Sequence, residues 1–337
     1  MDFFEEENMS IRKFLKNTGF FIASMNLLPF LNLNKLNVNA ENNKTKIGLI
    51  KSSDRSEAVD RALDLVPIQD IKGDSVLIKP NFNTADPAPG STHNDTLKKL
   101  IDNLWEAGAE KIIIGERSGP PNTRQVMQDK GIFELAENKG VEVINFDQLD
   151  QDELIHFETE HMHWKDGFHI PRILQEVDHI VAAGCLKTHQ FGGEFTMALK
   201  LAVGIIPAEG TDYMNQLHSS PDMRKKIAEI NLAYSPDLYL IDGVEAFVRG
   251  GPSTGKRVQS NVTLIGTDPI AIDAVGVAIL KELGSTNVIM NNPVFSQEQI
   301  ARAVEIGIGI SSPELIELVS DSSEGRNYKE KIKSILN

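Results

Sequence analysis

The sequence predicts an α/β protein with a mostly parallel β-sheet, helices on both faces and a Rossmann-like arrangement. Short apolar runs, several of them ended by glycine or proline, alternate with stretches of helical periodicity. This alternation is typical of strand–helix–strand units, which join parallel strands of one sheet. The chain has 337 residues, with 41% apolar and 24% charged residues, as in ordinary globular proteins.

Each predicted element follows from a local pattern. The apolar runs predict strands, one of which stops at Pro80. Apolar residues three or four positions apart predict helices, with Asn94 as a candidate cap and Pro269 in a first turn. The predicted strands cover residues 46–51, 74–80, 111–115, 141–146, 178–184, 237–242, 261–266 and 315–319, and the predicted helices cover residues 55–66, 95–107, a stretch up to 138, 222–234, 269–280 and 297–306.

The domain prediction is a leader over residues 1–40 and a single α/β domain over residues 41–337, with a polar insertion around residues 148–170. In the leader, residues 10–16 are basic, residues 19–33 are moderately apolar, and Val38 and Ala40 are small enough for a signal peptidase.

The leader resembles a twin-arginine export signal in which Ile11 replaces the first arginine. We therefore expect an exported protein, periplasmic or otherwise extracytoplasmic. The general secretory route, retention as an anchor and a disordered amphipathic tail remain alternatives. Asn26, Pro29 and Asn32 interrupt the apolar run, so we expect no stable membrane span.

Charge and cysteine content restrict the partners. The formal net charge of −14 argues against nucleic acid or an anionic membrane as the main partner. Cys185 is the only cysteine, which excludes an internal disulfide and an iron–sulfur cluster bound by cysteines of this chain. The cofactor is otherwise unknown.

Polar and charged side chains follow directly on several predicted strands. Because the carboxyl ends of parallel strands meet at one edge of a sheet, these side chains are expected to share a cleft. Lysines and glycine N–H groups there would hold a carboxylate or phosphate, and a histidine or desolvated lysine would exchange protons. The candidate catalytic residues are His189, Lys187, Lys200 and His218, and the candidate substrate-binding residues are Lys79, Asn81, Asn83, Thr188, Gly192, Gly193, Asp242 and Asp268.

Each of these residues also has a structural interpretation. Lys79-Pro80 and Asp242-Gly243 are ordinary strand ends and turns, and Asp268 would serve as a simple helix cap. The sequence has no glycine-rich dinucleotide or P-loop fingerprint and no nucleophile elbow.

A metal site is a separate hypothesis for the polar insertion. His156, His161 and His163 lie there with Glu158 and Glu160 between them, and imidazole and carboxylate at alternate positions of one strand could bind a metal. Alternating polar residues are also typical of an exposed hairpin.

The ordered set of motifs resembles the prokaryotic domain-of-unknown-function family number 362. The motifs are residues 77–81, 187–189, 198–200 with Gly204, His218, 241–243 with 251, 252 and 255, and 268–275. Leu201 departs from the asparagine common in that family. The resemblance, to the version without a ferredoxin module, implies an α/β domain and no established activity. A segment from His189 to His218 is similar to nickel-pincer lactate racemase-type enzymes, which use histidines and lysines around a tethered pyridinium nucleotide.

Three functions compete at this point. The first is an exported enzyme that acts on a small anionic substrate, carboxylate or phosphate, in a cleft at the strand ends. The others are a non-catalytic protein that binds a ligand or cofactor in the same cleft, and a metal-dependent, racemase-like enzyme.

Overall fold

A computed structural model of the chain describes residues 44–336, apart from 69–70, 121, 193 and 209–210. The predicted leader lies outside the described residues. From Thr45 onward the chain forms one compact unit.

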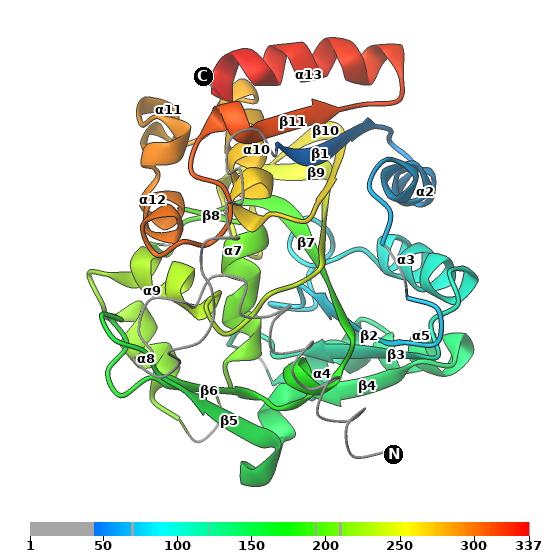
Figure 1. Ribbon diagram of the computed structural model, residues 1–337, viewed down its shortest axis with the longest axis vertical. Coiled ribbons are helices and arrows are strands. Elements are labelled where there is room, and N and C mark those ends of the chain that lie inside the picture. The colour runs from blue at the N-terminus through cyan, green and yellow to red at the C-terminus, as the bar shows by residue number, and fades with distance from the viewer. Residues whose placement is uncertain (1–43, 69–70, 121, 193, 209–210, 337) are drawn as a thin grey trace, which may run out of the picture. The chain divides into compact units, whose positions relative to one another are not determined.

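The unit is organised around one large sheet, shown in Figure 1. Its strand order is β11-β1-β10-β9-β7-β2-β3-β4, and β8 pairs with β7 alongside this path. Strands β9, β7, β2, β3 and β4 are parallel to one another, whereas β10 is antiparallel to both β9 and β1, and β8 is antiparallel to β7. The prediction of a mostly parallel α/β sheet is therefore confirmed. The strands are β1 Thr45–Lys51, β2 Ser75–Pro80, β3 Lys111–Glu116, β4 Glu142–Asn145, β7 His179–His189, β8 Glu194–Thr196, β9 Leu238–Gly250, β10 Gly255–Gly266 and β11 Ile316–Val319.

Helices cover both faces of the sheet, because the side chains of a buried parallel strand point alternately to either side. In β7, Ala182 belongs to the apolar cluster that contains α10, and its neighbour Ala183 to the cluster that contains α3. The helices are α2 Arg55–Leu65, α3 Asn94–Glu106, α4 Thr123–Asp129, α5 Ile132–Lys139, α6 Ile173–Glu176, α7 Ala198–Leu201, α8 Tyr213–His218, α9 Met223–Ile230, α10 Pro269–Glu282, α11 Asn287–Asn291, α12 Glu298–Glu305 and α13 Ser323–Leu336.

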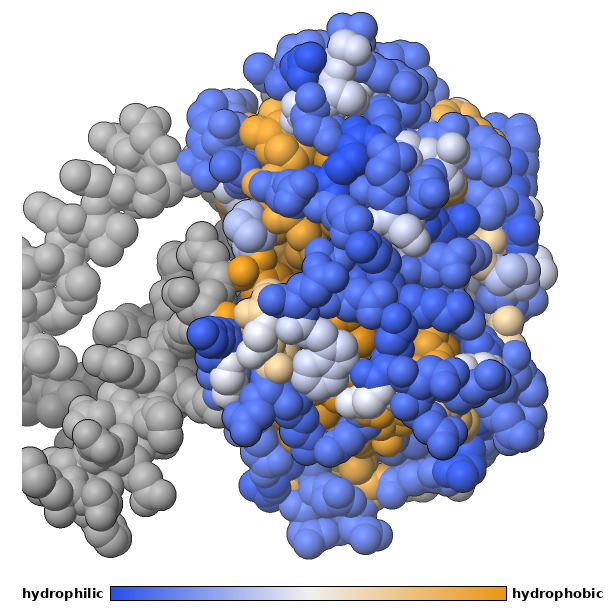
Figure 2. Space-filling model, turned by 90° about the vertical axis from the view of Figure 1, so that its right-hand side faces the viewer, coloured by the Kyte–Doolittle hydropathy of each residue, from blue (hydrophilic) through white to orange (hydrophobic). Residues whose placement is uncertain are grey.

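The outer surface is polar on the side of the molecule that bears α2 and α3. Figure 2 shows that the side of the molecule bearing α2 and α3 is mostly hydrophilic, with apolar residues visible in strips between hydrophilic ones. In α3 the apolar side chains Leu97, Leu100 and Leu104 are all buried. Within the part of the chain that the structure covers, no helix has the length and apolarity to cross a membrane.

Three strands are longer than predicted. β7 continues past Gly184 to His189, β9 continues past Gly243 to Gly250, and β10 begins at Gly255. The two glycines that were interpreted as strand ends lie inside strands. A Cβ atom at Gly243 would lie 2.9 Å from the carbonyl oxygen of Val262, so glycine permits close packing there and does not end the strand.

Two local predictions were also incomplete. α3 begins at Asn94 and is capped by His93, whose ring nitrogen accepts a hydrogen bond from the N–H of Asp95, and not by Asn94. The C-terminal helix α13 was not predicted, although its buried Ile332 and Leu336 show a helical spacing.

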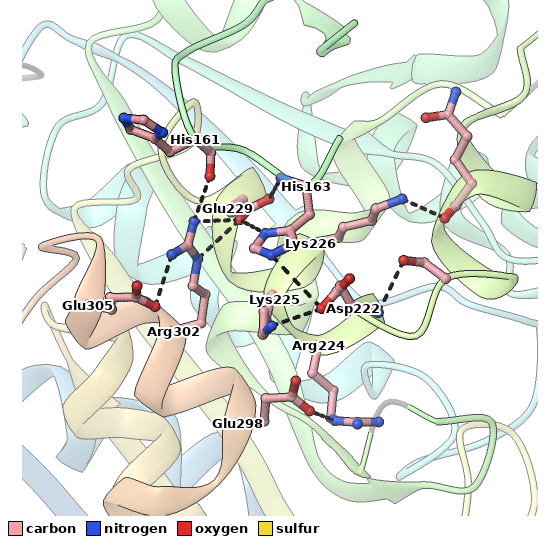
Figure 3. A network of polar contacts seen from close by, with 12 residues as sticks. His161, His163, Asp222, Arg224, Lys225, Lys226, Glu229, Glu298, Arg302 and Glu305 are labelled. Carbon is pink, nitrogen blue, oxygen red and sulfur yellow. Dashed lines mark hydrogen bonds and ion pairs between the residues drawn. The ribbon is translucent and has the colours of Figure 1, made fainter. Parts of the chain in front are cut away.

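The polar insertion contains a two-stranded hairpin of β5, Leu154–Phe157, and β6, Phe168–Pro171. A buried network anchors the segment between these strands, as Figure 3 shows. The carboxylate of Glu229 in α9 accepts hydrogen bonds from the backbone N–H of His163 at 2.8 Å and from Nη2 of Arg302 in α12 at 2.8 Å, and its Oε1 lies 2.6 Å from Nδ1 of His163. Glu229 is fully buried, so the insertion is fixed to α9 and α12 by a desolvated carboxylate.

We predict that Glu229→Ala lowers the free energy of unfolding by about 3 kcal/mol, because it removes a fully buried carboxylate that bonds both His163 and the partly buried guanidinium of Arg302. Glu305→Ala is the matched control, since Glu305 pairs with the same arginine but is mostly exposed, and it should change the free energy by about 1 kcal/mol or less. Urea unfolding followed by tryptophan fluorescence measures both. Equal losses in the two variants would contradict this role of the buried network.

Candidate functional site

The extension of β7 places Lys187 and His189 in one cavity. Because β7 pairs with β8, Lys187 stands opposite Thr196 and His189 opposite Glu194, two positions apart and thus on one face of the strand. The cavity has a volume of about 40 Å³. We call it the cationic cavity. It is lined by Asn81, Asn83, Glu116, Arg117, Gly119, Lys187, His189, Thr196, Lys200, Leu201, Val203, Gly204 and Pro252.

Lys200 reaches this cavity from the short helix α7. The start of α7 is held by the buried carboxylate of Asp273 in α10, which accepts hydrogen bonds from the N–H groups of Ala198 at 2.7 Å and Leu199 at 3.2 Å. Lys200 is only 7% exposed. Its ammonium group makes no hydrogen bond or ion pair with any residue that the structure describes. Burial, reinforced by the charges of Arg117 and Lys187, lowers the pKa of Lys200 to about 7.

Lys187 is fully buried but has partners. Its Nζ donates to the carbonyl oxygens of Gly90 at 2.5 Å and Pro252 at 3.2 Å, and so connects β7 to the loop after β2 and to the turn between β9 and β10. Burial lowers the pKa of Lys187 to about 8. Two of its three N–H groups are thereby used, which leaves one donor beside the cavity.

Arg117 adds a guanidinium group to the same wall. Nε donates to the carbonyl oxygen of Ile206 and Nη2 to that of Val203, both at 2.8 Å, so the side chain is fixed by backbone after α7. Burial lowers the pKa of Arg117, and Asp147 and Glu116 oppose this effect.

The cavity also holds polar atoms that lack partners. Nδ1 of His189, Oγ1 of Thr196 and Oδ1 of Asn81 are buried and make no hydrogen bond within the described structure. Burial, together with the charges of Lys200, Lys187 and His218, lowers the pKa of His189 to about 2, so its ring is neutral at physiological pH. Buried polar atoms normally have partners, so these three atoms of cavity-lining residues are candidates to bond a ligand or water.

Lys79 is not among the residues that line the cationic cavity. The sequence analysis made it an anion ligand, but its Nζ lies 2.6 Å from Oε1 of Glu116 and donates to the carbonyl oxygen of Pro80. A Cβ atom at Gly204 would lie 2.6 Å from this Nζ, so the glycine lets backbone close over the ion pair. Lys79 is therefore neutralised next to the cavity and does not line it.

The other candidate residues are spread over several places in the structure. Asn81 and Asn83 line the cationic cavity. Asp242 accepts hydrogen bonds from Arg55 and Thr96, and Asp268 caps α10 through the N–H of Ala271, so both have structural contacts outside it. His218 is exposed at the end of α8, and its pKa is lowered by partial burial and by the charges of Lys200 and Arg117. Thr188 and Gly192 line a second hollow, and Gly193 lies outside the described residues.

The histidines of the insertion do not meet at a metal site. His156 contacts the carbonyl oxygen of Asp166, His163 contacts Glu229, and the carbonyl oxygen of His161 accepts a bond from Arg302. His161 and Asp166 have positive φ angles, which break the strand alternation on which the metal hypothesis depended. Among the described residues, no three histidine, cysteine or carboxylate side chains are grouped to hold a metal ion.

Four residues that build the site were not among the predicted site residues. Arg117 and its neighbour Glu116 stand directly after β3, which was a usable signal, but their pairing required the three-dimensional structure. Thr196 lies in a strand that was not predicted, and Asp273 acts through the backbone of α7.

The chain is similar to a curated protein and to a solved structure, in both cases at low sequence identity. It is 24% identical over 219 residues to the thylakoid-associated protein sll1697 of Synechocystis, a match that covers 62% of this chain and 64%, less than two thirds, of that protein. The lactate racemase apoprotein of Thermoanaerobacterium thermosaccharolyticum superposes with a TM-score of 0.41 and 17% identity, over 59% of this chain and 50% of that one.

The family comparison covers the sheet core and the cationic cavity together. The family model described as Domain of unknown function (DUF362) matches residues 76–278, which include β2, β7, α7 and most of α10. The resemblance inferred from the motifs is therefore confirmed, and the chain belongs to the family Domain of unknown function (DUF362).

Proposed function

We propose that the cationic cavity binds the carboxylate or phosphate group of a small substrate, and that Lys200 exchanges a proton with that substrate. The observation that carries the proposal is the amine of Lys200, a residue that is only 7% exposed, lines the cavity, and makes no hydrogen bond or ion pair among the described residues. An unpaired buried charge is unfavourable, and an anion in the cavity would remove that penalty.

The surroundings of Lys200 support an anionic ligand. Lys187 and Arg117 add positive charge, while the nearby carboxylate of Glu116 is already neutralised by Lys79. The hydroxyl of Thr196 and the neutral ring of His189 offer hydrogen bonds to the ligand. A pKa of about 7 lets Lys200 act as an acid or a base at neutral pH, which is the condition for efficient proton transfer.

The location of this activity is part of the proposal. The basic and apolar leader, with small residues at 38 and 40, supports export.

The first test replaces the unpartnered charge. Lys200→Met should weaken the binding of acetate or inorganic phosphate by about tenfold or more, the equivalent of a hydrogen bond to a charged group. The variant should fold, because it removes a buried charge that lacks a partner. Lys226→Met is the control: Lys226 is also a buried lysine, but its Nζ donates to the carbonyl oxygen of Gln216 and lies outside the cavity. Isothermal titration calorimetry gives the affinities, and unchanged binding in Lys200→Met would reject the proposal.

The second test uses pH. Only a protonated amine attracts an anion, so affinity should be highest below about pH 7 and should fall as the pH rises through the pKa values of Lys200, about 7, and Lys187, about 8. Lys200→Arg keeps its charge at all these pH values, and the part of the pH dependence due to Lys200 should disappear. An affinity that is constant from pH 6 to pH 9 in the unsubstituted protein would contradict this assignment.

The third test concerns the carboxylate that positions Lys200. Asp273→Asn should weaken anion binding and shift its pH midpoint, because an amide cannot accept both N–H groups at the start of α7. Asp268→Asn is the matched control on the same helix, since Asp268 accepts two backbone N–H groups, of Ala271 and Ile310, away from the cavity. Both variants should lose stability, but a shifted midpoint in both would show that Asp273 has no specific effect on Lys200.

A further inference from the structure

A second pocket shares the lining residue His189 with the cationic cavity. It has a volume of about 260 Å³ and lies between the turn that follows β7 and the start of α11. We call it the outer groove. Its walls include Thr188, Gln190, Gly192, Glu194, Thr286 and Val288, and His189 contributes to both hollows.

The ring of His189 connects the two hollows. Its orphan Nδ1 belongs to the residue that lines the cationic cavity, and the same ring meets the ring of Phe191 edge-on, with centroids 6.0 Å apart. Phe191 stands between Gln190 and Gly192, two wall residues of the outer groove. A molecule that contacts His189 is therefore next to both hollows.

Two exposed apolar side chains lie at the outer groove. Phe191 is 61% exposed and Val288, in its wall, is 46% exposed. Together with Met290, at 41%, they are the large apolar side chains that stand exposed in the described structure. Exposed apolar side chains that gather beside a hollow are typical of a binding surface.

The volumes of the cationic cavity and the outer groove determine which part of a ligand each could hold. About 40 Å³ accommodates a carboxylate or phosphate group, or a few water molecules, but not an organic body as well. The body of an organic anion would have to lie outside the cationic cavity, and the outer groove is the adjoining space. The carboxylate of Glu194 in its wall disfavours a second anionic group there.

We propose that the outer groove binds the apolar body of an organic monoanion whose carboxylate or phosphate lies in the cationic cavity. This inference rests on the proposed function, and it specifies the substrate class as an anion with an aliphatic or aromatic body. Each buried methylene group then tightens binding by up to about fourfold, so affinity increases with chain length.

The experiment compares acetate with octanoate by calorimetry. The unsubstituted protein should bind octanoate at least about tenfold more tightly than acetate. Val288→Trp fills the outer groove and should remove this advantage. Val288→Asp, a second variant at the same exposed site, should remove it through charge repulsion. Met290→Trp is the matched control on the same helix, exposed but not part of either wall, and should keep the advantage.

The acetate affinity separates the two proposals. If acetate binds all variants but octanoate gains nothing in the unsubstituted protein, or keeps its gain in both Val288 variants, the outer groove does not hold the ligand body and the inference is overturned. If neither acetate nor inorganic phosphate binds the unsubstituted protein, the proposed function fails and this inference fails with it.

Discussion

The burial of positive charge near one end of β7 is the constraint on which the rest of the site depends. A lysine in a low-dielectric interior needs an anion, carbonyl dipoles or a lowered pKa. Lys79 has Glu116, and Lys187 has two carbonyl groups from distant loops. Lys200 has neither kind of partner in the described structure, and its pKa is lowered to about 7. The three buried lysines are thus accommodated differently: Lys79 by an ion pair, Lys187 by carbonyl groups and Lys200 by a lowered pKa. Of the three, only Lys200 keeps all its N–H groups available to a ligand.

The length of β7, β9 and β10 brings Lys187 together with its carbonyl partner in the turn between β9 and β10. β7 has to run past Gly184 for Lys187 and His189 to reach the cavity. β9 and β10 have to extend past the residues that pair with β7 and β1 for their turn to present the carbonyl group of Pro252. Close backbone approach makes this possible, since Gly243 and Gly204 lie where a Cβ atom would collide with its neighbours. The glycines therefore serve packing around the site more than they serve turns.

The amount that the sequence could predict follows from the range of the interactions. Strand and helix positions depend on local periodicity, so the parallel sheet and its two-sided cover were predictable. Strand ends were not, because a glycine at a strand end and a glycine inside a closely packed strand look alike in sequence. The neutralisation of Lys79 by Glu116 depends on the pairing of β2 with β3. The position of the antiparallel β10 between β1 and β9 depends on the arrangement of the whole sheet. Contacts between residues so far apart in the chain leave no local pattern in the sequence.

The same long-range charges determine which group is suited to exchange a proton in the proposed function. His189 was one of the predicted catalytic residues, because histidine ordinarily titrates near neutral pH. In the cavity, burial and two lysines lower the pKa of His189 to about 2, so the ring stays neutral and serves as a hydrogen-bonding group. The same effects bring the pKa of Lys200 down to about 7. An arriving anion would raise that pKa again, because opposite charge favours the protonated amine. Binding would thus favour the protonated amine, which is why the affinity is expected to fall as the pH rises.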